Sequence, residues 1–273
     1  MSFGGVICLA LILVCAAIPA HAQSDAEVRQ YHQPFELKLD RAIRKNFRSY
    51  RRQRPREEFT TESFFPIGWS KEGKFAYYVE PVDEACGCYF AKLLIVDLKT
   101  DKVLWSFDYN SEFIEEAKRE GRPYTLETLW RAHQKLFSEK LREYEIEPQE
   151  RPALFSFPIR YQGDRLTANL KTSEQPGLTT EERWYGTIGK AKLHLNSARK
   201  GSKTILAHSY ERVRPLYVGM IGYLKSPFES RIAVVLVEII RGYEGPPHTG
   251  DVRIVGASLH SGFAGKRKSN NAM

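Results

Sequence analysis

Hydrophobic and polar positions along residues 64–107 fall into short runs that are typical of an antiparallel β-meander. The apolar runs cover residues 64–69, 75–80, 91–98 and 103–107, and polar or glycine-containing turns separate most of them. In the third run four apolar residues follow one another without a polar interruption. Both faces of that strand should therefore be buried.

A looser copy of this pattern occupies residues 215–259. It contains a long apolar strand at 232–240, a glycine- and proline-rich loop at 242–250, and alternating apolar positions after the loop. Between the two copies, residues 166–170 and 191–195 alternate strictly between apolar and polar, as half-exposed antiparallel strands do. We expect all these strands to join one antiparallel sheet.

Two further segments carry the 3.6-residue period of an amphipathic helix. The main helix should run from Thr125 to Ile146, with Thr125 as its N-cap, and a shorter helix capped by Ser111 should precede it. The other amphipathic segment lies within residues 23–56. Its apolar stripe consists of Leu39, Ile43, Phe47 and Tyr50. This stripe would either dock on the body of the protein or lie on an anionic membrane surface.

These patterns predict an α+β fold. The body is an antiparallel β-sheet structure built from two blade-like meanders, with one main amphipathic helix packed on it. The predicted organisation is a signal peptide at 1–22, a basic and helical N-terminal segment at 23–56, a single α+β body at 57–262, and a disordered basic tail at 263–273.

Two sets of residues give the chain a family resemblance. Trp69 to Tyr77, Ile95 to Leu98, Thr100 and Lys102 resemble parts of one blade of a TolB-like, WD-repeat-like propeller. A propeller needs several blades of about 40–45 residues each, so a complete propeller is not expected. The loop Gly242-Tyr243-Glu244-Gly245-Pro246 resembles the closing segment of a family of predicted secreted bacterial proteins of unknown function. This resemblance implies a secreted protein and supplies no activity.

The N-terminal residues predict the cellular address. Residues 6–18 are apolar but too few to span a bilayer comfortably, and Ala20-His21-Ala22 is a small-x-small cleavage pattern. We therefore predict a signal peptide cut after Ala22, a periplasmic or secreted protein, and no transmembrane segment after cleavage. A retained membrane anchor is the alternative, since residues 1–5 carry no Lys or Arg.

The formal net charge of +8 is distributed unevenly. Residues 41–56 are rich in basic side chains and contain no acid, the tail adds Lys266, Arg267 and Lys268, and the body is close to neutral. We predict that the first segment binds an anionic surface. Its basic residues are Arg41, Arg44, Lys45, Arg48, Arg51, Arg52, Arg54 and Arg56. Nucleic acid is disfavoured as a partner, because a secreted protein meets lipid headgroups and acidic envelope polymers more readily.

Cys86-Gly87-Cys88, in the loop between two predicted strands, is the most specific chemical feature. An oxidising compartment favours a disulfide there. Four interpretations stay open: a local disulfide or inert thiol pair, a disulfide between two chains, a redox-active pair, and a metal site completed by Asp83, Glu84 or a distant histidine. The other histidines of the mature chain outside the main helix are His32, His194, His208, His248 and His260. They are scattered along the chain, and no nucleophile elbow, zinc-protease motif or phosphate-binding loop is present.

The sequence thus predicts no catalytic residue, no bound metal and no cofactor. The leading hypothesis is a secreted or periplasmic, non-enzymatic binding module for a partner protein or an anionic envelope surface. The alternative is a periplasmic enzyme, either a metal-dependent hydrolase or a thiol oxidoreductase, that uses Cys86 and Cys88.

Overall fold

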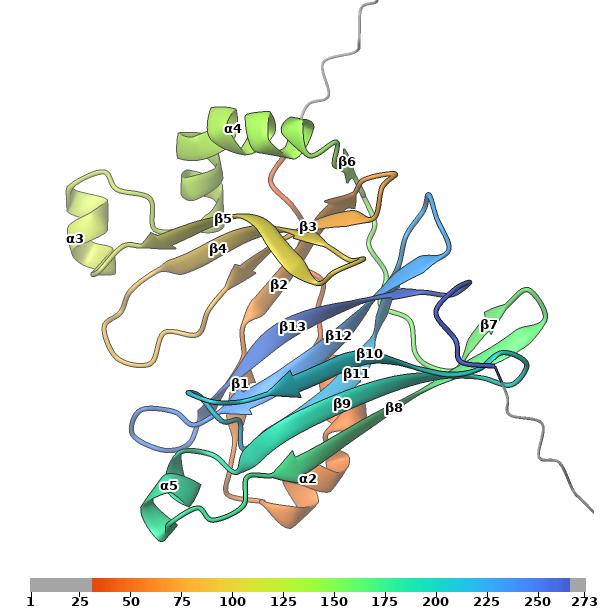
Figure 1. Ribbon diagram of the computed structural model, residues 1–273. Coiled ribbons are helices and arrows are strands. Elements are labelled where there is room, and N and C mark those ends of the chain that lie inside the picture. The colour runs from red at the N-terminus through yellow and green to blue at the C-terminus, as the bar shows by residue number, and fades with distance from the viewer. Residues whose placement is uncertain (1–30, 266–273) are drawn as a thin grey trace, which may run out of the picture. The chain divides into compact units, whose positions relative to one another are not determined.

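The strands of the described chain form three sheets arranged in layers (Figure 1). The computed structural model describes residues 31–265, so the predicted signal peptide and the basic tail from Lys266 onward lie outside the described residues. Within this range no helix is long and apolar enough to cross a membrane.

The first sheet contains the predicted meander of residues 64–107. Its strands are ordered β5-β4-β3-β2-β6, and every neighbouring pair is antiparallel. The bounds are β2 Ser63–Trp69, β3 Lys74–Glu80, β4 Phe90–Asp97, β5 Lys102–Asn110 and β6 Glu147–Pro148. In β4, Leu93 and Ile95 are buried on one face and Val96 on the other, which confirms the prediction of a strand buried on both sides.

The second sheet contains the looser copy of the meander. Its order is β1-β13-β12-β11, with a parallel pair between β1 and β13 and antiparallel pairs elsewhere. The bounds are β1 Phe59–Thr61, β11 Tyr217–Lys225, β12 Arg231–Ile240 and β13 His248–Ser258. The third sheet has the order β10-β9-β8-β7 and is antiparallel throughout. Its strands are β7 Ile159–Tyr161, β8 Asp164–Glu174, β9 Ile188–Ser197 and β10 Gly201–Ser209.

Strand β12 joins the layers, because its side chains are buried alternately on both faces. Val235, Val237 and Ile239 belong to the apolar core shared with the first sheet. Val234 and Leu236 belong to the core shared with the third sheet. Each fully buried aliphatic side chain contributes roughly 1.5–3 kcal/mol, so β12 stabilises two interfaces at once. The sequence predicts one sheet; three are formed because both faces of this apolar strand need a partner layer.

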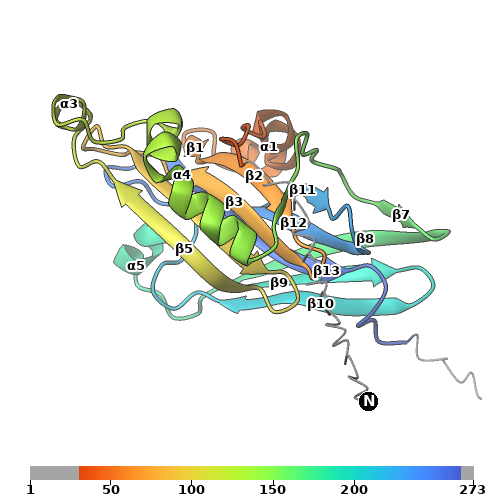
Figure 2. The same ribbon diagram turned by 90° about the horizontal axis from the view of Figure 1, so that it is seen from above.

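The main helix covers the outer face of the first sheet (Figure 2). It is α4, Leu126–Glu143, and Thr125 caps it by accepting a hydrogen bond from the backbone N–H of Thr128, as predicted. The shorter helix, α3 Ile114–Arg119, is not capped by Ser111, whose hydroxyl instead accepts from the N–H of Tyr89. Another short helix, α5 Thr180–Tyr185, precedes β9.

The basic N-terminal segment forms two short helices rather than one, α1 Asp40–Asn46 and α2 Arg48–Gln53. The apolar stripe of this segment is buried in the core between the first and second sheets. The observed fold is therefore the α+β class with an antiparallel body that the sequence predicts, and it is not a closed propeller.

Candidate functional site

The C-x-C loop, defined as residues 81–89 between β3 and β4, is organised around the carboxylate of Asp83. Asp83 Oδ1 accepts hydrogen bonds from the N–H groups of Ala85 (3.3 Å) and Cys86 (3.2 Å), and Oδ2 accepts from that of Cys88 (3.1 Å). Gly87 adopts a positive φ of 65°, which a glycine tolerates without strain. The Asp83 carboxylate therefore holds three backbone N–H groups of this loop.

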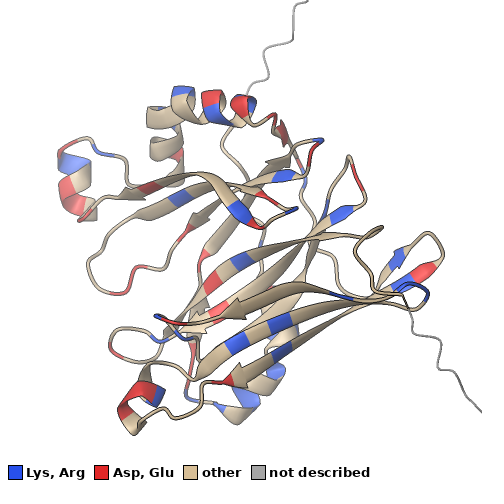
Figure 3. Ribbon diagram, viewed as in Figure 1, with Lys and Arg blue, Asp and Glu red and all other residues tan. Residues whose placement is uncertain are grey.

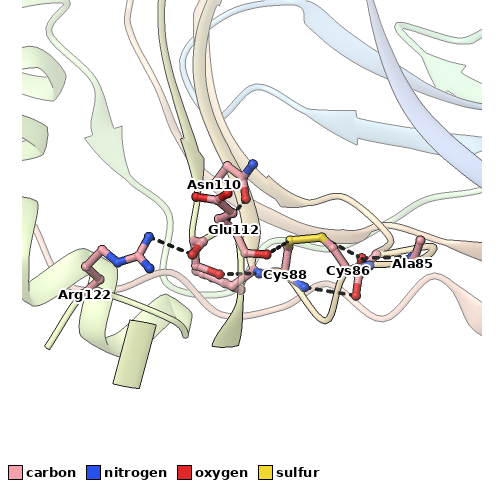
Figure 4. The surroundings of a disulfide bond; sticks show 9 residues. Ala85, Cys86, Cys88, Asn110, Glu112 and Arg122 are labelled. Atoms are coloured by element: carbon pink, nitrogen blue, oxygen red, sulfur yellow. Dashed lines mark hydrogen bonds between the residues drawn. A yellow bond between two sulfur atoms is a disulfide. The ribbon is translucent and has the colours of Figure 1, made fainter. Parts of the chain in front are cut away.

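Cys86 and Cys88 form a disulfide. Cys88 is buried and lies against the backbone carbonyl of Glu112 (Figure 4). Cys86 is half-buried. The loop is also held by the N–H of Ile114, which donates to the carbonyl of Gly87 over 3.1 Å. The two sulfur atoms therefore lie next to each other within one chain.

The charges around the cysteines do not favour thiol chemistry. Asp83 Oδ1 lies 3.5 Å from Cys86 Sγ, and a carboxylate so close disfavours the thiolate that exchange reactions need. A potential ligand atom from each of Asp83, Cys86 and Cys88 lies within 4.8 Å of the others. Metal binding there would require a reduced disulfide and would compete with the three N–H groups that already bind the Asp83 carboxylate.

A pocket of about 460 Å³ lies between the C-x-C loop and the β12–β13 loop, defined as residues 241–247. The two loops were separate features in the sequence, and the structure brings them together. The N–H of Tyr243 donates to Glu84 Oε2 over 3.2 Å. A Cβ at Gly242 would lie 2.6 Å from the carbonyl oxygen of Pro247, so this tight loop requires glycine at that position. The lining residues are Pro81, Val82, Asp83, Glu84, Ala85, Cys86, Phe90, Ile240, Arg241, Tyr243, Thr249 and Asp251.

His248 holds the β12–β13 loop through a hydrogen bond with the backbone of Gly242. Its side chain is fully buried, and its Nδ1 accepts a hydrogen bond from the N–H of Gly242 over 3.3 Å. Nδ1 is therefore unprotonated, and Nε2 is the nitrogen that donates to the carboxylate of Glu57. The sequence pattern left His248 among scattered histidines, because its partners are distant in the chain or backbone groups.

Buried carboxyl groups near this end of β13 were also missed by the sequence. Glu238 is buried and accepts from the hydroxyl of Tyr210 (2.5 Å) and from Arg253. Desolvation, together with the charge of Glu238, raises the pKa of Asp251, which lies opposite Glu238 in the β12–β13 register. Burial raises the pKa of Glu62 to about 8, against a hydrogen bond from the N–H of Val252 that lowers it.

The basic residues of the N-terminal segment are mostly exposed, and Figure 3 shows Lys and Arg positions along its helices. Leu39, Ile43, Phe47 and Tyr50 are each at most 5% exposed. Of the predicted anion-binding residues, all but the half-buried Arg54 are exposed, and within residues 31–265 none of them forms a salt bridge. Those residues are Arg41, Arg44, Lys45, Arg48, Arg51, Arg52, Arg54 and Arg56.

Two clefts border these helices. One, of about 350 Å³, is lined by Arg51, Arg54, Pro55, Glu57, Glu58 and Phe59. The other, of about 320 Å³, is lined by Asp40, Ile43, Arg44 and Arg51 with residues of β1. Guanidinium groups in clefts can contact phosphate or carboxylate groups from more than one direction. The structure thus places six of the predicted basic residues on α1 and α2, whereas Arg54 and Arg56 follow the end of α2.

No family model, curated protein or solved structure matches the chain.

Proposed function

We propose that this protein is a secreted or periplasmic, non-enzymatic binding module, and that α1 and α2 hold it on an anionic envelope surface. The observation that carries the proposal is that the apolar and the basic side chains of residues 39–56 lie in different environments. The apolar stripe is buried in the core, whereas the basic side chains, all exposed except the half-buried Arg54, form no salt bridge within residues 31–265.

This arrangement favours a charge-dependent contact with the surface over insertion of the helices into a membrane. A helix that inserts into a membrane buries its apolar face among the acyl chains, but here that face is occupied by the protein's own core. Binding then depends on charge, with lipid phosphates or acidic polymer groups approaching Arg44 and Arg51 in the clefts. Such binding weakens as salt screens the charges.

The test compares two variants with the same loss of charge. In the first, Arg44, Arg48 and Arg51 are replaced by Gln; in the control, Lys171, Lys190 and Lys192 on the exposed face of the third sheet are replaced by Gln. Co-sedimentation is measured with vesicles containing phosphatidylglycerol, with neutral vesicles, and with an acidic polysaccharide immobilised on beads.

Each Arg near an anionic surface is worth about 1 kcal/mol, so the first variant should bind anionic vesicles roughly 100-fold more weakly. The lysine control should bind as the unmodified protein does. Salt at 1 M should release the unmodified protein and the lysine control from the vesicles. Equal binding to neutral vesicles, or an equal loss in the control, would overturn the proposal. Retention on the polysaccharide but not on vesicles would identify an acidic polymer as the surface.

The enzyme alternative predicts the opposite sensitivity. An activity that uses Cys86 and Cys88 should survive loss of the three arginines and disappear in Cys86→Ser or Cys88→Ser. The carboxylate of Asp83, 3.5 Å from Cys86 Sγ, makes us favour the binding function.

A further inference from the structure

We propose that the pocket between the C-x-C loop and the β12–β13 loop binds the side chain of a lysine or arginine from a polypeptide ligand. This site is separate from the basic face of α1 and α2 and does not depend on the function proposed for that face. The argument rests on the charge, the walls and the rim of the pocket.

The lining of the pocket carries more negative than positive side chains, although Lys92 and Arg253 also act on Asp251 from outside the lining. Asp83, Glu84 and Asp251 line it, against the single cationic side chain of Arg241. Within residues 31–265 none of these four residues takes part in a salt bridge. The guanidinium of Arg241 lies over the ring of Trp184, 3.2 Å from the ring centre, so that face of it is covered. An anionic ligand would meet three carboxylates, whereas a cation relieves their repulsion.

The walls suit the aliphatic stem of a basic side chain. Pro81, Val82, Phe90 and Ile240 supply apolar surface, and Lys and Arg side chains bury their methylene groups on such surface while the charged end finds polar partners. The volume of about 460 Å³ is within the range of small-ligand pockets. A bare metal ion would leave these walls unused.

Hard cations such as Ca²⁺ also need six to eight free oxygen ligands. Here both Asp83 oxygens accept backbone N–H groups, and Glu84 Oε2 accepts from the N–H of Tyr243. An ammonium or guanidinium needs fewer oxygens and can use the outer lone pairs of carboxylates that are already bonded.

The rim carries an exposed aromatic side chain. Tyr243 is 84% exposed, although the backbone of its loop is fixed by Glu84 and His248. An aromatic ring held at the mouth of an acidic pocket can attract a cation to its face. A cation-binding role would account for an exposed tyrosine in a loop that is otherwise rich in glycine and proline.

The experiment titrates the ¹⁵N-labelled protein with N-acetyl-lysine methylamide and, separately, with the uncharged N-acetyl-norleucine methylamide. Amide chemical shifts are followed at Glu84, Cys86, Tyr243 and Asp251. The charge-removing variant combines Glu84→Gln with Asp251→Asn, which keep the side-chain shapes and the acceptor for Tyr243. A control for the loss of a surface carboxylate is Glu139→Gln, on the exposed side of α4.

We expect the lysine derivative to shift these four amides and the norleucine derivative to leave them in place. The double variant should bind at least tenfold more weakly, because charge-assisted hydrogen bonds are lost, and Glu139→Gln should match the unmodified protein. Equal shifts with norleucine, unchanged affinity in the double variant, or no shift at about 10 mM lysine derivative, where a millimolar site would be mostly filled, would each overturn the proposal. The comparison of the two ligands on the unmodified protein remains decisive even where the double variant folds poorly.

Discussion

At the residue scale, the buried polar side chains near the candidate site form hydrogen bonds with residues that are distant in the sequence. His248 is bonded to Glu57, which lies 191 residues away in the chain, and Glu62 accepts from the N–H of Val252. The sequence identified Cys86 and Cys88, because their spacing is itself a chemical signal. It could not identify His248 or Glu62, because a lone histidine or glutamate looks the same in a sequence whether it is buried or exposed.

The raised pKa of Glu62 leads to a prediction for the pH dependence of stability. With a pKa of about 8 in the folded protein and about 4.3 when unfolded, Glu62 holds a proton in the fold that it has lost in the unfolded chain. Stability therefore falls as pH rises through this interval, by up to about 1.4 kcal/mol per pH unit from this group.

The measurement is the free energy of unfolding in urea between pH 5 and pH 9 for the unmodified protein and for Glu62→Gln. Glutamine keeps an acceptor for the N–H of Val252 and cannot ionise, so the variant should lose less stability than the unmodified protein as pH rises. Parallel pH profiles for the two proteins would show that Glu62 is ionised throughout the range.

At the element scale, local periodicity predicted the elements well and their partners less well. Helix α4 and its cap at Thr125, the strands of the meanders, and the burial of both faces of β4 all follow from short-range patterns. Ser111 was assigned as a helix cap because its residue type favours that role, but tertiary contacts gave its hydroxyl to the N–H of Tyr89. The pairing of β1 with β13 joins segments too far apart for any local pattern to indicate.

The contact of the basic segment with the body gives a prediction at this scale. Phe47, between α1 and α2, packs so closely on Gly219 of β11 that a Cβ there would lie 2.6 Å from ring atom Cε2. Gly219→Ala should therefore cost about 1–3 kcal/mol by overpacking. In a Phe47→Leu background, where the ring is absent, the same change should cost clearly less.

The readouts are urea unfolding of both single variants and the double variant, and hydrogen exchange across residues 40–53. Gly219→Ala alone should speed exchange in α1 and α2, because the ring must move. Additive effects of the two changes would mean that Phe47 does not sit against Gly219 in solution, and that the basic helices are placed in another way.

At the scale of the whole molecule, the three sheets depend on one another through β12. Its Val235 and Val237 pack towards the first sheet, and its Val234 and Leu236 towards the third. The sequence identified this strand as a long apolar run, but nothing in the sequence says which layers cover its two faces. The sequence therefore predicted the class of fold correctly and the number of sheets incorrectly, because stacking is decided by surfaces that form only after the strands have paired.

Because β12 lies in two cores, damage on one of its faces should spread to both. Leu236→Ala removes a fully buried side chain from the core shared with the third sheet and should cost about 2–5 kcal/mol. We expect hydrogen-exchange protection to fall by the same free energy in β3 and in β9, whereas Val103→Ala, at an exposed position on β5, should change neither by more than about 0.5 kcal/mol. Protection lost in β9 alone would mean that the third sheet opens by itself while the first and second sheets stay folded. The basic helices and the acidic pocket would then keep their structure without it, since α1 and α2 pack in the core between the first and second sheets and both pocket loops extend from strands of those sheets.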